Sequence, residues 1–79
     1  MKVRFFAQLR DLVGCDALDV DLANGAAVSD LLEEIYKRFP AVRSHDKSIL
    51  VAAGLEFVDR NYNLKPGDEI SVMPPVQGG

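Results

Sequence analysis

Cysteine is nearly absent from this sequence, since Cys15 is the only one among 79 residues. A single thiol forms neither an intramolecular disulfide nor a thiolate metal cluster. Its neighbours in "VGCDALD" are apolar or carboxylate side chains, and nearby carboxylates disfavour a reactive thiolate. We therefore expect Cys15 to be a small, partly buried packing residue. A sulfur-carrying nucleophile is the less favoured interpretation.

Long apolar runs and an excess of positive charge are missing as well. No stretch approaches the roughly 20 apolar residues of a membrane-spanning helix. Charges interrupt the start "MKVRFFAQLRDLVG" before the apolar core of a signal peptide can form. The 12 acidic and 9 basic side chains give a net charge of −3, which disfavours nucleic acid and anionic lipid as partners. We expect a cytoplasmic protein that binds neither.

Catalytic constellations are also lacking. His45 is the sole histidine and lies in a polar stretch, where such a residue is more often a surface group than a general base or metal ligand. The glycines Gly25, Gly54 and Gly67 are isolated and typical of turns, so they form no phosphate-binding loop. We expect no metal site, no permanently bound cofactor and no active site within the body of the chain.

The apolar residues that are present follow two different periods. Alternation in "KVRFF" (2–6) and "ALDVDL" (17–22) predicts the two strands of a first β-hairpin, with a short helical turn at 7–14 between them. A stripe at helical spacing over 28–39 predicts one main helix that ends before Pro40.

The second half of the chain predicts three more strands. After a loop at 41–48, the segments 49–54, 55–58 and 69–74 have the composition of strands separated by turns. Pro74 and Pro75 end the last strand because proline donates no hydrogen bond to a sheet. The order ββαβββ predicts an α+β domain over residues 1–73, with one main helix packed across a mixed sheet of about four to five strands. A chain of 79 residues has room for one modest core.

The end of the chain, "MPPVQGG", predicts an extended tail over residues 74–79. Pro74 and Pro75 favour a stiff polyproline geometry, and six extended residues reach roughly 20 Å. Gly78 and Gly79 lack Cβ atoms, so a narrow channel can admit their backbone. We interpret 74–79, with Val76 and Gln77 in its middle, as a tail that inserts into another protein, and an ordinary frayed terminus as the alternative.

The reactive group of such a tail is the terminal carboxylate of Gly79. An α-carboxyl group has an ordinary pKa of about 3.5, so at neutral pH it is an anion and a poor electrophile. Adenylation by ATP on a separate enzyme activates it. The acyl adenylate then reacts either with sulfur, giving a thiocarboxylate, or with a cysteine, giving a thioester and later an amide. The first product is a sulfur donor and the second is a protein tag.

Three segments carry a resemblance that runs over nearly the whole chain: "VRFFAQLRDLVG", "VSDLLEEI" and "LKPGDEISVMPPVQGG". With the Gly-Gly end, they resemble the ubiquitin-like β-grasp family and, within it, the small sulfur-carrying subunits of molybdopterin synthase. The resemblance implies that an E1-like enzyme adenylates Gly79 and that a thiocarboxylate follows. It also implies that the tail enters the large synthase subunit, in a heterotetramer, and delivers sulfur to cyclic pyranopterin monophosphate to form the dithiolene. The chain is then a sulfur-donating subunit without an active site of its own.

Two other functions fit the same ending. A sulfur carrier for the thiazole of thiamine has the same fold and the same Gly-Gly end, although such carriers tend to be shorter. A ubiquitin-like modifier would instead be conjugated to lysines through Gly79. The sequence leaves both alternatives open.

Phe6, Phe57 and Met73 are the candidate partner-binding residues. Alternation turns Phe6 and Met73 away from the core side of the first and last strands, and those strands are neighbours in a β-grasp sheet. An apolar patch on a polar sheet face, next to the root of the tail, is typical of a docking site. We predict that these residues contact both the activating enzyme and the large subunit. The alternative is that a loop of the same protein covers them.

Overall fold

The computed structural model describes residues 1–75, and it divides them into strands and helices much as the periodicities predict. The elements, in chain order, are β1 (Lys2–Phe5), α1 (Ala7–Val13), β2 (Ala17–Asp19), α2 (Val28–Arg38), α3 (Pro40–Arg43), β3 (Leu50–Ala53), β4 (Glu56–Val58) and β5 (Ile70–Met73). Residues 76–79 of the predicted tail lie outside the described residues.

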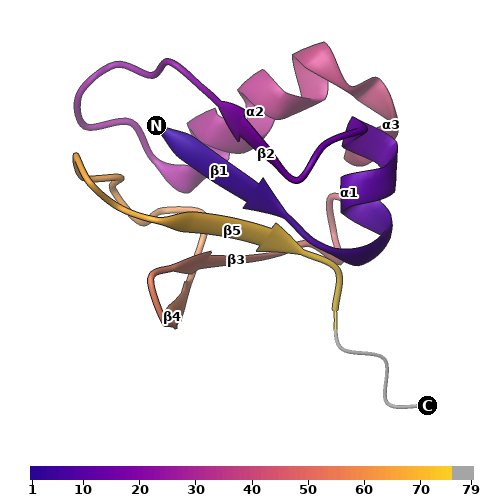
Figure 1. Ribbon diagram of the computed structural model, residues 1–79. Helices are drawn as coiled ribbons and strands as arrows, with labels where there is room; N and C mark the ends of the chain where they lie inside the picture. The colour runs from indigo at the N-terminus through magenta and orange to yellow at the C-terminus, as the bar shows by residue number, and fades with distance from the viewer. Residues whose placement is uncertain (76–79) are drawn as a thin grey trace.

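The strands form one mixed sheet with the order β2-β1-β5-β3-β4. β1 pairs antiparallel with β2 and parallel with β5, while β3 pairs antiparallel with both β5 and β4. The predicted first hairpin and the predicted adjacency of the first and last strands are both confirmed. In Figure 1, β1 and β5 run in the same direction through the middle of the molecule.

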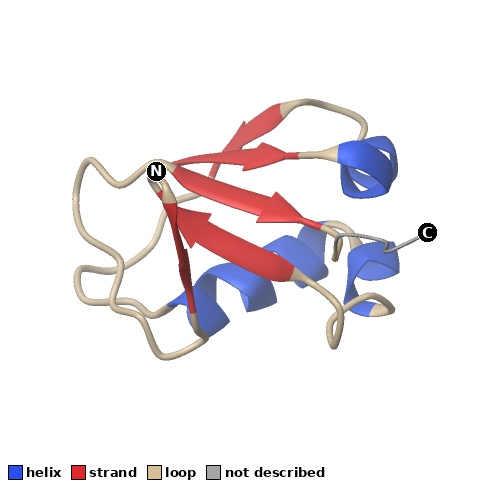
Figure 2. Ribbon diagram, turned by 90° about the horizontal axis from the view of Figure 1, so that it is seen from below, coloured by secondary structure: helices blue, strands red, loops and turns tan. Residues whose placement is uncertain are grey.

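The main helix α2 covers one face of this sheet. Val3 lies opposite Ile70 and Phe5 lies opposite Val72, and all four are buried with the apolar stripe of α2. Full burial of such a side chain contributes roughly 1.5–3 kcal/mol through removal of apolar surface from water. Figure 2 shows α2 lying along the sheet and α1 and α3 gathered at one end of it. The prediction of one main helix across a sheet is therefore confirmed.

The short helix α1 begins and ends with left-handed backbone. Gly14 follows its last turn with φ 84°, and its N–H donates to the Arg10 carbonyl at 2.8 Å. This conformation suits glycine, which has no Cβ atom to clash. At the other end Ala7 has φ 52° and is the one positive-φ residue other than glycine within residues 1–75. The sequence predicted a helical turn at 7–14, but not the conformation of Ala7.

The second strand is shorter than the predicted segment 17–22, because β2 ends at Asp19. Asp19 lies opposite Lys2, the first residue of β1, so the ladder has little partner strand left beyond it. Val20 is nevertheless buried, and its N–H donates to the Met1 carbonyl at 2.8 Å. The burial of Val20 agrees with the alternation of segment 17–22, although β2 itself is shorter than that segment.

Pro40 follows the end of α2, as predicted, and also begins α3 in a region predicted as a loop. Proline fits the first position of a helix, where its missing N–H needs no partner. Phe39 has non-helical backbone (φ −135°, ψ 78°), in keeping with the restriction that proline places on the preceding residue. α3 contributes Val42 to the core.

Carbonyl groups of a distant loop cap the start of α2. Ala27 occupies the N-cap position and offers no side-chain acceptor. The Val28 N–H donates to the Tyr62 carbonyl at 3.0 Å, and the Ser29 N–H donates to the Arg60 carbonyl at 3.1 Å. The loop that precedes β5 thus satisfies backbone donors that have no partner inside the helix.

Candidate functional site

Phe6 and Met73 belong to the face of the sheet opposite α2, which we call the open face. Phe6 has extended backbone (φ −128°, ψ 154°), and its N–H donates to the Val72 carbonyl at 3.2 Å. It therefore continues the pairing of β1 with β5 by one residue. Since Phe5 and Val72 are buried on the core side, alternation turns Phe6 and Met73 to the open face.

Leu50 and Phe57 share this face. Leu50 lies opposite Met73 in the pairing of β3 with β5, and Phe57 lies opposite Ala52, two residues after Leu50. We define the apolar patch as Phe6, Leu50, Phe57 and Met73. The sequence did not reveal Leu50, because the unbroken apolar run "ILVAA" has no alternation that separates one face from the other.

The apolar patch is open to solvent. The exposed fraction is 45% for Phe6, 36% for Leu50 and 65% for Phe57, against 2% for Phe5 on the core side. No segment within residues 1–75 therefore buries the two phenylalanines. Phenylalanine and methionine are enriched at protein–protein interfaces, so the open face is suited to contact another protein surface.

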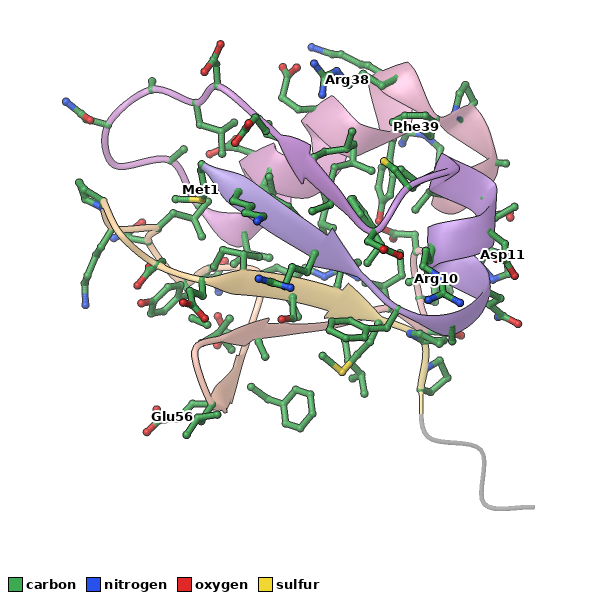
Figure 3. The ribbon with its side chains drawn as sticks, viewed as in Figure 1. Met1, Arg10, Asp11, Arg38, Phe39 and Glu56 are labelled. Carbon is green, nitrogen blue, oxygen red and sulfur yellow. The ribbon has the colours of Figure 1, made fainter. Side chains whose placement is uncertain are left out.

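The root of the predicted tail lies at the end of β5. Pro74 and Pro75 follow Met73 without regular structure and are half-buried, and the chain leaves the sheet there (Figure 1). Figure 3 shows Arg10 of α1 at the same end of the molecule, where it forms an ion pair with Asp16 at 3.6 Å. The predicted site residues Val76, Gln77, Gly78 and Gly79 lie outside the described residues.

Cys15 is half-buried and packs against the core, as predicted. It lines a shallow hollow with Arg10, Asp11, Gly14 and Asp16. The sequence suggested only carboxylates nearby, whereas the turn of α1 also brings Arg10 to the hollow. Arg10 is paired with Asp16, so we retain the interpretation of Cys15 as a packing residue.

One polar cluster joins three segments on the helix side of the sheet. Tyr36 of α2 donates its hydroxyl to the Asp46 carboxylate, and Arg60 donates to the same carboxylate at 3.0 Å and to the Asp46 carbonyl. Burial, followed by the bond to Asp46, raises the pKa of Tyr36 well above its usual range. The hydrogen bonds from Tyr36 and Arg60 lower the pKa of Asp46. Because these groups satisfy one another, we interpret the cluster as structural.

His45 takes part in a turn rather than in a cluster of ligands. It is half-buried, its N–H donates to the Val42 carbonyl at 3.0 Å, and its carbonyl accepts the Ser48 N–H at 2.9 Å. Among residues 1–75, no three or more His, Cys, Asp or Glu side chains are placed to hold a metal ion. In the same range no helix has the length and apolar character needed to cross a bilayer.

The sheet order and the crossing helix define a class of proteins. A mixed five-stranded sheet, with parallel first and last strands in its middle and one main helix packed across it, is the ubiquitin-like β-grasp fold. The chain belongs to the ThiS family, which it matches over residues 3–79. The predicted fold class is confirmed by the topology and by the solved structures that share it.

Two relatives that match the whole chain carry the same functional name. The molybdopterin synthase sulfur carrier subunit of Chlamydomonas reinhardtii is 36% identical over 81 residues, covering 100% of this chain and 98% of the relative. The subunit of the same name from Escherichia coli strain K12 is 37% identical and covers 100% of this chain and 99% of the relative. The resemblance inferred from the three sequence segments is thus confirmed.

Solved structures extend the similarity to the backbone. A putative molybdopterin converting factor subunit 1 from Pyrococcus furiosus superimposes with a TM-score of 0.86 at 36% identity, covering 95% of each chain. SAMP1 from Haloferax volcanii gives 0.84 at 29% identity, covering 99% of this chain and 97% of that one. A protein–protein complex of subunits 1 and 2 of molybdopterin-converting factor from Helicobacter pylori contains a chain with a TM-score of 0.66 at 28% identity, with coverages of 99% and 96%.

Proposed function

We propose that this chain is a sulfur carrier in molybdenum cofactor biosynthesis. An E1-like enzyme consumes ATP to adenylate the carboxylate of Gly79, and sulfur then replaces the adenylate to leave a thiocarboxylate. The tail enters the large subunit of molybdopterin synthase, where its sulfur passes to cyclic pyranopterin monophosphate and forms the dithiolene. The chain supplies the reacting group, while its partners supply the catalytic groups.

The observation that carries this proposal is full-length similarity to relatives named as molybdopterin synthase sulfur carrier subunits. The family match includes residue 79, the proposed reactive position. The Helicobacter pylori complex of subunits 1 and 2 supports a large-subunit partner. The E1-like enzyme, the heterotetramer and the cytoplasmic location remain predictions made from the sequence.

In this proposal residues 1–73 form the domain that partners recognise, and residues 74–79 form the inserting tail. Pro74 and Pro75 begin the tail directly after β5. Val76 and Gln77 continue it, and Gly78 leaves room for a partner's catalytic groups around the terminal carboxyl carbon.

The apolar patch is the proposed binding site for both partners, because it lies beside the root of the tail. A partner bound there receives the tail in a defined direction. Truncation of an anchor at the centre of an interface typically costs about 2 kcal/mol or more, which corresponds to a loss of affinity of roughly thirtyfold. We expect Phe6→Ala and Met73→Ala each to weaken binding to the activating enzyme and to the large subunit by about this factor.

Calorimetric titration of the chain with each purified partner measures these affinities, and circular dichroism verifies folding. The chain offers a matched pair of leucines for this experiment. Leu50 lies in the apolar patch with 36% exposure, and Leu12 lies on α1 with 37% exposure. Leu50→Ala should weaken binding and Leu12→Ala should not. Equal affinities for the parent and the folded patch variants would place specificity in the tail alone.

Intact mass spectrometry of the protein from sulfur-replete cells tests the function itself. A carrier in use contains a fraction of molecules in which one oxygen of the terminal carboxylate is replaced by sulfur, and the mass increases accordingly. Reconstitution with the large subunit and cyclic pyranopterin monophosphate should then yield molybdopterin. A thiocarboxylated chain that supports thiazole formation, but no dithiolene, would assign it to thiamine synthesis instead.

A second candidate function is protein modification, and the similarity to SAMP1, the small archaeal modifier protein 1 of Haloferax volcanii, favours it. Here an amide between Gly79 and a lysine of another protein replaces the thiocarboxylate as the product. Trypsin cleaves this chain last after Arg60, because Lys65 precedes a proline. Tryptic peptides that carry residues 61–79 in isopeptide linkage to a lysine, absent from cells that lack this gene, would establish this role.

A further inference from the structure

We propose that Arg4 determines which partner the open face accepts, by requiring a carboxylate on the partner beside the apolar patch. The partner is the large synthase subunit, with an acidic side chain in the surface that covers the sheet. This inference rests on the proposed function and adds to it the charge of the partner's docking surface.

Arg4 lies in the middle of the open face. It is opposite Ala17 on β2 and opposite Ser71 on β5. The same row continues through Ala52 of β3 to Phe57 of β4, one of the residues of the apolar patch. Each cross-strand neighbour in this row is uncharged, so a surface that covers the patch also approaches the guanidinium group.

Arg4 is exposed, and its guanidinium group makes no ion pair or side-chain hydrogen bond with a group in residues 1–75. The ion pairs recorded there use other cations, namely those of Arg10, Lys37, Arg43 and Arg60. Asp68 and Glu69 line a small hollow together with Arg4 and Lys2, but neither carboxylate forms an ion pair within 4.0 Å with Arg4. Asp68 already accepts hydrogen bonds from the Tyr62 hydroxyl and the Lys65 N–H.

Lys2 is the second cation of β1 on the open face, and its surroundings differ. It lies directly opposite Asp19 on β2, so it has an acidic cross-strand neighbour, although the ion pairs recorded within residues 1–75 do not include it. The open face therefore carries one cation with an acidic cross-strand neighbour and, nearer to the apolar patch, one cation whose cross-strand neighbours are uncharged. This contrast provides a matched control within one strand.

Docking removes water from Arg4, and a desolvated charge that stays unpaired opposes association strongly. A carboxylate on the partner offsets this loss with a bidentate, charge-assisted pair, for which the planar guanidinium is well shaped. A neutral or basic surface of the same shape is rejected. Although the chain has a net charge of −3, the open face thus selects an acidic partner surface.

The test uses the full chain and the purified large synthase subunit of the same organism, titrated by calorimetry. Arg4→Met keeps the length of the side chain and removes its charge, and Arg4→Glu reverses the charge. We expect about a tenfold loss of affinity for Arg4→Met and about a hundredfold loss for Arg4→Glu. Lys2→Met should change the affinity less than threefold by the same measure. Circular dichroism verifies that every variant folds.

Charge reversal on the partner completes the experiment. Acidic residues of the large subunit are changed to lysine one at a time, and one of these variants should restore binding of Arg4→Glu while weakening binding of the parent chain. Parent-like affinity of Arg4→Met, or loss of affinity without rescue by any lysine variant, overturns the inference and leaves the proposed function intact. If the parent chain does not bind the large subunit, the proposed function fails and this inference fails with it.

Discussion

Ala7 has the left-handed backbone conformation, with φ 52°, at the first position of α1. An L-residue with a Cβ atom pays roughly 1–2 kcal/mol for this conformation, and glycine does not. We expect Ala7→Gly to raise the free energy of unfolding by about 1 kcal/mol. Urea denaturation at neutral pH measures this change.

Ala41 supplies the control for that substitution. It is exposed in α3 and does not have a positive φ, so Ala41→Gly should lower stability by roughly 0.5–1 kcal/mol. Destabilisation of the same size at both positions would show that the backbone at Ala7 is not strained.

The packing role of Cys15 makes a second prediction at this scale. Cys15→Ala should receive sulfur at Gly79 at the parental rate, because the thiol takes no part in the chemistry. Loss of a small, half-buried side chain should cost at most about 2 kcal/mol of stability. Mass spectrometry of the loaded protein and urea denaturation measure the two effects. A folded Cys15→Ala protein that no longer accepts sulfur would show that sulfur passes through this residue.

Single residues were predictable where they broke a pattern. Phe6 stood out because it is aromatic at an outward position, and its exposure follows from that alternation. Leu50 did not stand out, because its face depends on the pairing of β3 with β5. The conformation of Ala7 carries no sequence signal, since alanine is an ordinary helix residue.

The cluster of Tyr36, Asp46 and Arg60 acts at the scale of elements, because it ties α2 to the loops before β3 and after β4. Folding lowers the pKa of Asp46, so the unfolded chain binds this proton more readily than the folded one. The stabilisation is present above the ordinary aspartate pKa of about 3.9 and is lost as the pH falls through the lower folded value. We expect stability to decrease below about pH 4 for this reason.

Asp46→Asn should lower the free energy of unfolding at neutral pH and reduce the part of the acid dependence that the cluster causes. Urea denaturation at neutral pH and near pH 3 measures both effects. Asp21→Asn, at an exposed position outside the cluster, is the control and should change neither. An acid dependence of Asp46→Asn identical to that of the parent would contradict the assignment.

Elements were predictable where one segment carries its own periodicity, as α2 and β1 do. The length of β2 depends on where its partner strand β1 begins. The start of α2 depends on the carbonyl acceptors of Arg60 and Tyr62, which lie more than 30 residues away in the sequence. The sequence did not reveal the short helix α3, because Pro40 indicates the end of α2, whereas proline also suits the beginning of the next helix.

At the scale of the whole molecule, the reactive end and the folded body are predicted to be separable. The buried core recorded for the described residues ends at Val72, so deleting Gly79 or extending the chain beyond it should leave the fold intact. Because only the terminal carboxylate reacts, either change should abolish sulfur transfer. Dithiolene formation in the reconstituted synthase measures activity, and circular dichroism measures folding. Normal activity of a chain with an uncleaved C-terminal extension would refute the proposed chemistry.

The topology was predictable from the order of elements and the family resemblance, and the composition of the tail pointed to its chemistry. The charge selectivity of the open face was not predictable in this way. Arg4 and Lys2 look equivalent in "MKVRFF", and only the partner strands distinguish them, because one faces Asp19 and the other faces Ala17.

The central position of β5 also bears on how the chain is made. A ribosome releases residues in order, so β1, β2, β3 and β4 emerge while the strand between β1 and β3 is still missing. The sheet therefore closes only after synthesis has passed Met73, and Met73 itself completes the apolar patch. A chain broken off before β5 has neither a closed sheet nor the full surface that partners bind. Under the proposed function, the activating enzyme therefore binds the full-length chain only after β5 has paired with β1 and β3, so the sheet is closed before Gly79 reacts.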